Sequence, residues 1–176
     1  MQTINVIDKF ILNKCSVKSR SIIFFIVSFV ATGCFVGKIK YAPGTLGSLL
    51  AIVFCPYFIA LSKTWQIIIL VSLIALGFFC THVFLQISNK QNQDPKEVVI
   101  DEIAAIFFAS WLCQFSNVIQ MNWQHFLSIF ALFRFFDILK PYPISWIDKN
   151  VLGAKGIMLD DFAAAIASWV VFVAYY

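Results

Sequence analysis

Charged side chains are scarce in this sequence. Asp, Glu, Lys and Arg together make up 12% of the chain, whereas hydrophobic residues make up 61%; soluble proteins average about 25% charged residues. So low a charge content excludes an ordinary water-soluble domain and predicts an integral membrane protein, with no nucleic-acid partner.

The sequence also lacks internal repeats, low-complexity tracts and a flexible linker. Its 176 residues suffice for one compact domain but not for a second folded unit beside several membrane helices. We therefore predict a basic cytoplasmic N-terminal tail over residues 1–20 and a membrane-embedded domain over residues 21–176. The first apolar stretch has no clear signal-peptidase site, so we expect it to be retained.

Cysteine and histidine are too few and too scattered to form a disulfide framework or a metal cluster. The five cysteines are odd in number and show no Cys-x-x-Cys spacing, so they are expected to be free core residues. His82 and His125 lie in or beside apolar runs and are expected to be packed or interfacial. A metal site would have to use carboxylate oxygens, which favour Mg²⁺ or a similar hard ion over zinc.

Continuous apolar runs dominate the rest of the chain. They do not alternate between apolar and polar residues, which indicates membrane helices and not the strands of a barrel. We predict an all-α, polytopic membrane helical bundle of about five to six apolar helices. The predicted helices lie near residues 22–36, 44–61, 65–88, 97–121, 125–139 and 160–176.

Lysines are concentrated on one side of this predicted bundle. The connections at 37–44, 89–97 and 140–160 share a side if the second to fifth helices span, and they hold seven lysines. The positive-inside rule places that side in the cytoplasm. Because the basic tail should lie there too, we predict that residues 22–36 are re-entrant or interfacial.

Capping explains some of the acidic residues near the helix ends. Asp94 and Glu97 suit a capping box, with Pro95 at the first helical position. One of the two consecutive aspartates at 160–161 could cap the last helix. The remaining carboxylates either snorkel to water at the membrane surface or require cations, because a charge at the bilayer centre costs about 2.5–3.5 kcal/mol.

Three residues near these acids are candidates for binding a phosphate. Thr45 could simply cap the following helix, or it could join Ser48, nearby lysines and the free N–H groups of that helix in an anion site. Arg134 could bind phosphate or only pair with Asp137 three residues later. Lys140 could bind phosphate or serve as an interfacial anchor.

Carboxylates, basic residues and a divalent ion at a membrane surface suit chemistry on a phosphate-bearing lipid. The sequence has no Asp-x-Asp pair, no Cys-x5-Arg loop, no histidine pair and no paired Asp-x3-Asp motif. Attack by metal-activated water is therefore favoured, with a carboxylate nucleophile second. A small ion-coupled membrane carrier is an alternative, since acidic pairs and broken helices also mark transport pathways, but a carrier should show two related halves.

Four ordered motifs resemble the phosphatidylglycerophosphatase A family of bacterial membrane enzymes. They are YAPGTLGS, VVIDEIAA, FRFFDILKPYPI and GAKGIMLDDFAA, and the resemblance covers roughly residues 30–170. It implies a Mg²⁺-dependent phosphatase that hydrolyses the terminal phosphate monoester of phosphatidylglycerophosphate to phosphatidylglycerol and phosphate, in glycerophospholipid biosynthesis. It also implies a multi-pass protein of the bacterial inner membrane whose active site faces the cytoplasm.

The resemblance further implies a set of site residues within a membrane-embedded phosphatase domain. The expected catalytic residues are Asp101, Glu102, Asp137, Asp160 and Asp161; the expected metal ligands are Asp101, Glu102, Asp160 and Asp161; and Thr45, Arg134 and Lys140 are expected to bind the substrate phosphate. A phosphatase for another lipid phosphate, such as phosphatidic acid, is the alternative. The apolar faces would allow a homo-oligomer without requiring one.

Overall fold

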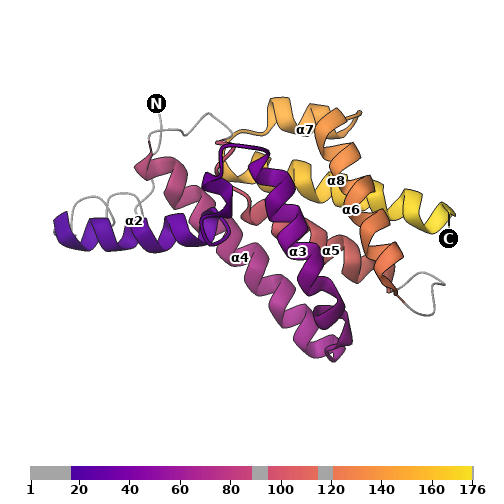
Figure 1. Ribbon diagram of the computed structural model, residues 1–176. Helices are drawn as coiled ribbons and strands as arrows, with labels where there is room; N and C mark the ends of the chain where they lie inside the picture. Colours follow the sequence, from indigo (N-terminus) through magenta and orange to yellow (C-terminus); the bar gives the residue numbers. More distant parts are fainter. Residues whose placement is uncertain (1–16, 89–94, 115–120, 176) are drawn as a thin grey trace.

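The computed structural model describes residues 17–88, 95–114 and 121–175, and these ranges contain helices and no β-strand. The elements are α2 (Val17–Ala31), the 3-10 helix η1 (Val36–Lys38), α3 (Pro43–Ala60), α4 (Lys63–Ile87), α5 (Ile100–Cys113), α6 (Trp123–Leu139), α7 (Ile144–Asn150) and α8 (Ala154–Tyr175). Figure 1 shows their arrangement. The prediction of an all-α chain is confirmed.

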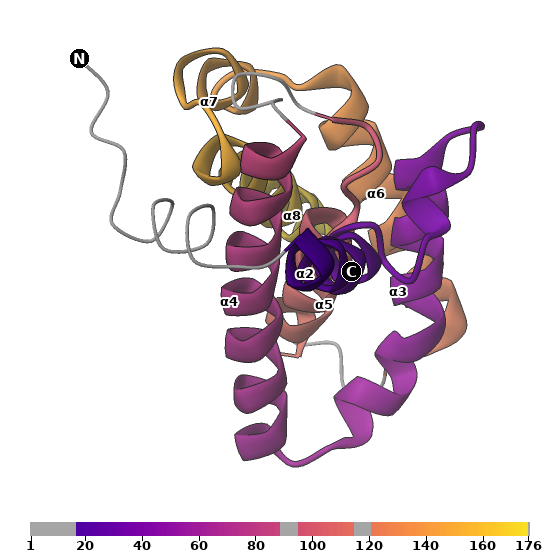
Figure 2. The ribbon, with the colours of Figure 1, turned by 90° about the vertical axis from the view of Figure 1, so that its left-hand side faces the viewer.

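Helix α5 lies at the centre of the bundle, with α3, α4, α6 and α8 packed around it (Figure 2). Its sequence explains this position, because Ala104, Ala105 and Ala109 are completely buried. On α8, Ala164 and Ala165 are buried as fully, and α5 packs directly on α8. Small residues let the two backbones approach closely, so the acidic residues on both helices are brought into one region.

Two peripheral helices complete the bundle. Helix α2 packs against α4, and α7 packs against α8. The short helix α7 was not predicted, because its residues fell in what we expected to be a connection between helices. It follows a cis peptide bond between Tyr142 and Pro143.

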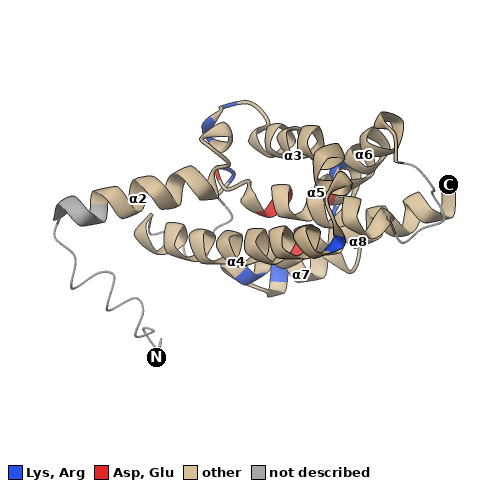
Figure 3. Ribbon diagram, turned by 90° about the horizontal axis from the view of Figure 1, so that it is seen from below, with Lys and Arg blue, Asp and Glu red and all other residues tan. Residues whose placement is uncertain are grey.

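Among the described residues, three helices, α3, α4 and α8, are long and apolar enough to cross a membrane. Long uncharged stretches are visible on α4 in Figure 3, where Val71 and Phe79 are among the exposed apolar residues. Helices α5 and α6 are shorter, at 14 and 17 residues. The structure supports a membrane helical protein, but helix length supports three spans and not the predicted five to six. The re-entrant segment at 22–36 and a homo-oligomer stay predictions.

The start of α5 differs from the prediction. Residues 95–99 are not helical and α5 begins at Ile100, so the capping box that we expected around Glu97 is wrong; Asp94 lies outside the described residues. The helix therefore starts later than residue 97, and Asp101 and Glu102 lie in its first turn. They are not one to two turns inside it, and they stand where the helix dipole favours negative charge.

The start of α8 also differs from the prediction. The helix begins at Ala154 and not near residue 160. Asp160 and Asp161 therefore lie about two turns inside α8, and the proposal that one of them caps the helix is wrong. Both side chains are buried, so they do not snorkel to water. Burial favours the alternative that these carboxylates require cations.

The expectation for the histidines holds, and the expectation of core cysteines holds for three of the four described ones. Cys55, Cys80 and Cys113 are buried, Cys34 is exposed, and none of these four forms a disulfide within the described residues; Cys15 lies outside the described residues. His82 stacks on Phe78. His125 packs against Phe172 and also forms a capping box with Asn122 at the start of α6.

Candidate active site

A cavity of about 350 Å³ lies where the first turns of α3 and α5, the end of α6 and the second turn of α8 come together. All eight residues that the sequence predicted as site residues line it: Thr45, Asp101, Glu102, Arg134, Asp137, Lys140, Asp160 and Asp161. These residues are spread over more than a hundred positions of the chain, so only the packing of four helices brings them together.

The first turn of α3 forms one wall of the cavity. Ala42 precedes the helix in a left-handed conformation (φ 44°), and Pro43 occupies the first turn. Thr45 therefore lies inside that turn and does not cap the helix, contrary to one of its two expected roles. The free N–H groups and the dipole at such an end favour an anion.

Arg134 on α6 joins α5 to α6 within the cavity. Its Nη1 lies 3.1 Å from Glu102 Oε1 and 2.7 Å from Asp137 Oδ2. Ser48 on α3 donates to Glu102 Oε2 at 3.4 Å and accepts from Arg134 Nη1 at 3.5 Å. The predicted pair between Arg134 and Asp137 is confirmed, but the contacts to Glu102 and Ser48 were not predicted.

Arg134 also has a hydrogen-bond donor that is not used. Its Nε is buried and has no hydrogen-bond partner among the described residues. Two carboxylates hold the guanidinium in place, and such charge-assisted bonds restrict its orientation. The side chain is thus fixed while part of its hydrogen-bonding capacity is unused.

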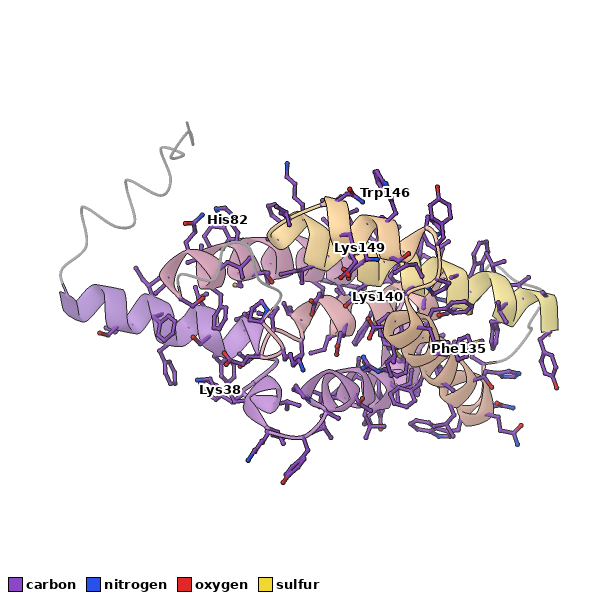
Figure 4. All side chains as sticks on the ribbon, turned by 90° about the horizontal axis from the view of Figure 1, so that it is seen from above. Lys38, His82, Phe135, Lys140, Trp146 and Lys149 are labelled. Carbon is purple, nitrogen blue, oxygen red and sulfur yellow. The ribbon has the colours of Figure 1, made fainter. Side chains whose placement is uncertain are left out.

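Lys140 is the second basic anchor of the cavity. It ends α6 in a left-handed conformation (φ 42°), and its Nζ lies 2.6 Å from Asp160 Oδ2 and 2.5 Å from Asp148 Oδ1. Burial lowers the pKa of Lys140, but the bonds to the two aspartates outweigh this effect and raise the pKa above its ordinary value. Lys140 is therefore a positively charged link between α6, α7 and α8, and Figure 4 shows it near the middle of the molecule.

The aspartates of α5 and α8 are almost inaccessible to water. Asp101, Asp160 and Asp161 are 5%, 4% and 5% exposed. In each acidic pair the second residue's backbone N–H donates to the first carboxylate: Glu102 to Asp101 Oδ1 at 2.9 Å, and Asp161 to Asp160 Oδ1 at 3.1 Å. Burial of several carboxylates in one place is unfavourable unless positive charge balances them.

Asp161 also carries a buried polar atom without a partner among the described residues of the cavity wall. Its Oδ2 is buried and has no hydrogen-bond partner within residues 17–88, 95–114 and 121–175. A buried acceptor without a partner costs about 1–3 kcal/mol, and more when it is charged. Binding of a proton or a cation at Asp161 Oδ2 would remove this cost.

The donor set suits a hard cation, although no complete coordination shell is preformed. Within the part of the chain that the structure describes, no three His, Cys, Asp or Glu side chains are grouped to hold a metal ion. Mg²⁺ does not require such a group, because it usually binds one or two carboxylates, several waters and the substrate phosphate. The oxygen ligands and the unpartnered Asp161 Oδ2 fit this mode of binding.

Sequence reasoning missed two residues at the site. Asp148 was missed because α7 was not predicted. Lys96 was counted as a loop lysine, yet it lines the cavity. Ser48 was expected only beside Thr45 in a possible anion site, and in the structure its Oγ donates to the Gly44 carbonyl at 2.9 Å and to Glu102 Oε2.

Comparison with known proteins places the cavity in a functional context. Residues 29–176 match the family described as phosphatidylglycerophosphatase A. Phosphatidylglycerophosphatase A of Escherichia coli (strain K12) is 32% identical over 142 residues, 79% of this chain and 77% of the relative. Phosphatidylglycerophosphatase A of Haemophilus influenzae is 34% identical over 145 residues, 82% of this chain and 85% of the relative.

A third relative carries a different name. A putative phosphatidylinositol-3-phosphatase of Bacteroides thetaiotaomicron is 31% identical over 152 residues, 83% of this chain and 91% of the relative. No solved structure matches the chain.

Proposed function

Because the chain belongs to the phosphatidylglycerophosphatase A family, we propose that it hydrolyses the terminal phosphate monoester of phosphatidylglycerophosphate to phosphatidylglycerol and phosphate. Membership makes the protein an enzyme, a phosphoric monoester hydrolase. The observation that carries the proposal is the convergence of eight polar residues from four motifs on one cavity. The reaction would belong to glycerophospholipid biosynthesis at the bacterial inner membrane.

The basic wall of the cavity would bind the phosphate to be removed. Arg134 and Lys140 are held by carboxylates, so their positive charges are positioned before substrate arrives. They would neutralise the phosphoryl oxygens, and the first turn of α3 with Thr45 would supply further donors. Asp137 bonds Arg134 directly, so we assign it the role of positioning that guanidinium.

The acidic wall would hold Mg²⁺. Asp101, Glu102, Asp160 and Asp161 offer the oxygen ligands that this ion prefers. When bound, the ion would polarise the phosphoryl group and favour attack by water. Asp161, which has a buried oxygen without a partner, is the residue whose charge would depend most on the ion.

The test compares wild-type enzyme with Asp161→Asn and with the control Glu97→Gln, whose exposed carboxylate does not line the cavity. Phosphate release from phosphatidylglycerophosphate is measured in detergent, with Mg²⁺ and with EDTA. We expect rapid release by wild type and by Glu97→Gln, and none with EDTA or with folded Asp161→Asn. Unchanged release by Asp161→Asn would show that the Asp161 carboxylate is not needed for hydrolysis. Phosphate release in the presence of EDTA would refute the role of Mg²⁺.

A second substrate class has a specific observation in its favour. The Bacteroides relative is named as a putative phosphatase of a phosphorylated phosphatidylinositol, so the cavity could accept another lipid phosphate monoester. Phosphatidic acid and phosphatidylinositol 3-phosphate are therefore assayed in parallel. Faster release from either than from phosphatidylglycerophosphate would replace the proposed substrate.

We also propose that the cavity faces the cytoplasm. The segments that contribute Lys96 and Lys140 to its lining belong to the lysine-rich connections, which the positive-inside rule places on the cytoplasmic side.

A further inference from the structure

One of the basic side chains that line the cavity forms no ion pair within residues 17–88, 95–114 and 121–175. The lining includes five carboxylates and three basic side chains, the latter being Lys96, Arg134 and Lys140. Arg134 and Lys140 form ion pairs with cavity carboxylates. Lys96 forms no ion pair or hydrogen bond among the described residues and is exposed. It is therefore the lining cation that is available to an incoming anion.

The backbone that carries Lys96 is held in place although its side chain is free. The Val98 N–H donates to the Pro95 carbonyl at 2.9 Å, which closes a turn around Lys96. The Val99 N–H donates to the Ala31 carbonyl at 3.0 Å, which ties the segment to the end of α2. Both valines are buried. Lys96 is thus a flexible side chain on a fixed base at the cavity, suited to act as a point charge.

The proposed substrate carries two phosphate groups of different kinds. The terminal monoester is the group to be cleaved, and the phosphodiester links the headgroup glycerol to the diacylglycerol. While Arg134, Lys140 and the first turn of α3 hold the monoester, the diester must lie farther out along the same molecule. Lys96, a cation at the cavity without a partner among the described residues, matches this second charge.

We propose that Lys96 binds the phosphodiester of the substrate, so that the enzyme favours lipids with a phosphodiester in addition to the terminal monoester. This inference rests on the proposed phosphatase function and adds a specificity residue to it. Phosphatidic acid has a monoester but no diester, and therefore gains nothing from Lys96.

The experiment compares Lys96→Ala and Lys96→Arg with Lys149→Ala, a control that removes an exposed lysine of α7 outside the cavity lining. Phosphate release gives kcat and KM, and isothermal titration in mixed micelles gives Kd for each lipid. For phosphatidylglycerophosphate, we expect Lys96→Ala to raise KM and Kd about tenfold with kcat nearly unchanged, as for loss of one charge-assisted bond. Lys96→Arg should stay near wild type, and Lys149→Ala should change neither constant.

Phosphatidic acid provides the discriminating comparison. We expect Lys96→Ala to bind it within about twofold of wild type, because the lost contact serves only the diester. Equal weakening for both lipids would show a general electrostatic effect and overturn the proposal, as would unchanged binding of phosphatidylglycerophosphate. If wild type binds that lipid but releases no phosphate, the proposed hydrolysis fails, while the ratio of the two Kd values still tests Lys96.

Discussion

Gly44 provides a sharp test of the cavity geometry, because its missing side chain makes room for Glu102. A Cβ added at Gly44 would lie 1.9 Å from Glu102 Oε1 and 2.8 Å from Oε2, whereas ordinary contact begins near 3.4 Å. In Gly44→Ala the carboxylate must therefore retreat by well over an ångström. That movement breaks the 3.1 Å contact between Glu102 Oε1 and Arg134 Nη1.

The substitution should lower both the activity and the stability of the enzyme. A displacement of about 1 Å in a catalytic group can cost about 100-fold in rate, so we expect kcat/KM to fall about 100-fold in Gly44→Ala. Loss of one hydrogen bond to a charged group should destabilise the fold by about 1.5–3 kcal/mol. The change in kcat/KM is measured by phosphate release from phosphatidylglycerophosphate, and the change in stability is measured by thermal unfolding in the same detergent.

Gly77→Ala is the matched control, since it makes the same substitution within helix α4. Its added Cβ would lie 3.3 Å from the terminal methyl of Met158, which is flexible and can move aside. We expect wild-type activity and unchanged or slightly increased stability, because alanine favours a helix over glycine by about 0.5–1 kcal/mol. Wild-type activity in Gly44→Ala, or an equal loss in both variants, would refute the placement of Glu102 against α3.

Three further predictions concern the link at Lys140 and the topology. Asp148→Asn should raise KM about two- to fivefold with kcat little changed, because Lys140 keeps Asp160 but loses a second, partly exposed partner; unchanged KM would contradict the link. The bonded aspartates raise the pKa of Lys140, so its ammonium group is fully charged below about pH 10 and loses its proton only as the pH rises through the raised pKa. The variant Lys140→Met should therefore be less stable than wild type by an amount that stays constant between about pH 6 and 9. Thermal unfolding of both proteins across this range measures the difference. For topology, single cysteines replacing Lys9 and Lys38 should react with an impermeant maleimide from the same side of the membrane, and labelling from opposite sides would show that residues 22–36 span.

The local pattern of the sequence was sufficient for the six longer helices, but not for α7 or for all the helix ends. The apolar runs predicted six helices, and α3, α4 and α6 begin and end within two residues of the predicted bounds. The starts of α5 and α8 were misplaced because Asp94, Asp160 and Asp161 were read as caps, a local role that these residue types often have. In the structure, tertiary packing and not capping accounts for the two aspartates of α8.

The identity of the site residues followed from their residue types and from the motifs that contain them. Carboxylates and basic residues in an otherwise apolar chain are unfavourable in lipid, so their presence alone indicated a functional site. The missed residues Lys96 and Asp148 lie in connections, where charged residues are ordinary and carry no such signal.

The sequence by itself determined that the protein is embedded in a membrane, that it is helical, and which residue types form the site. These features follow from hydrophobicity and residue type, which are local properties. Only the tertiary structure decided which cation meets which carboxylate. Arg134 pairs with Glu102 across two helices, Lys140 pairs with Asp160, and Lys96 pairs with neither group. Arg134 and Glu102 lie 32 positions apart along the chain and Lys140 and Asp160 lie 20 apart, and no sequence period connects them. Their meeting depends on the packing of α6 against both α5 and α8.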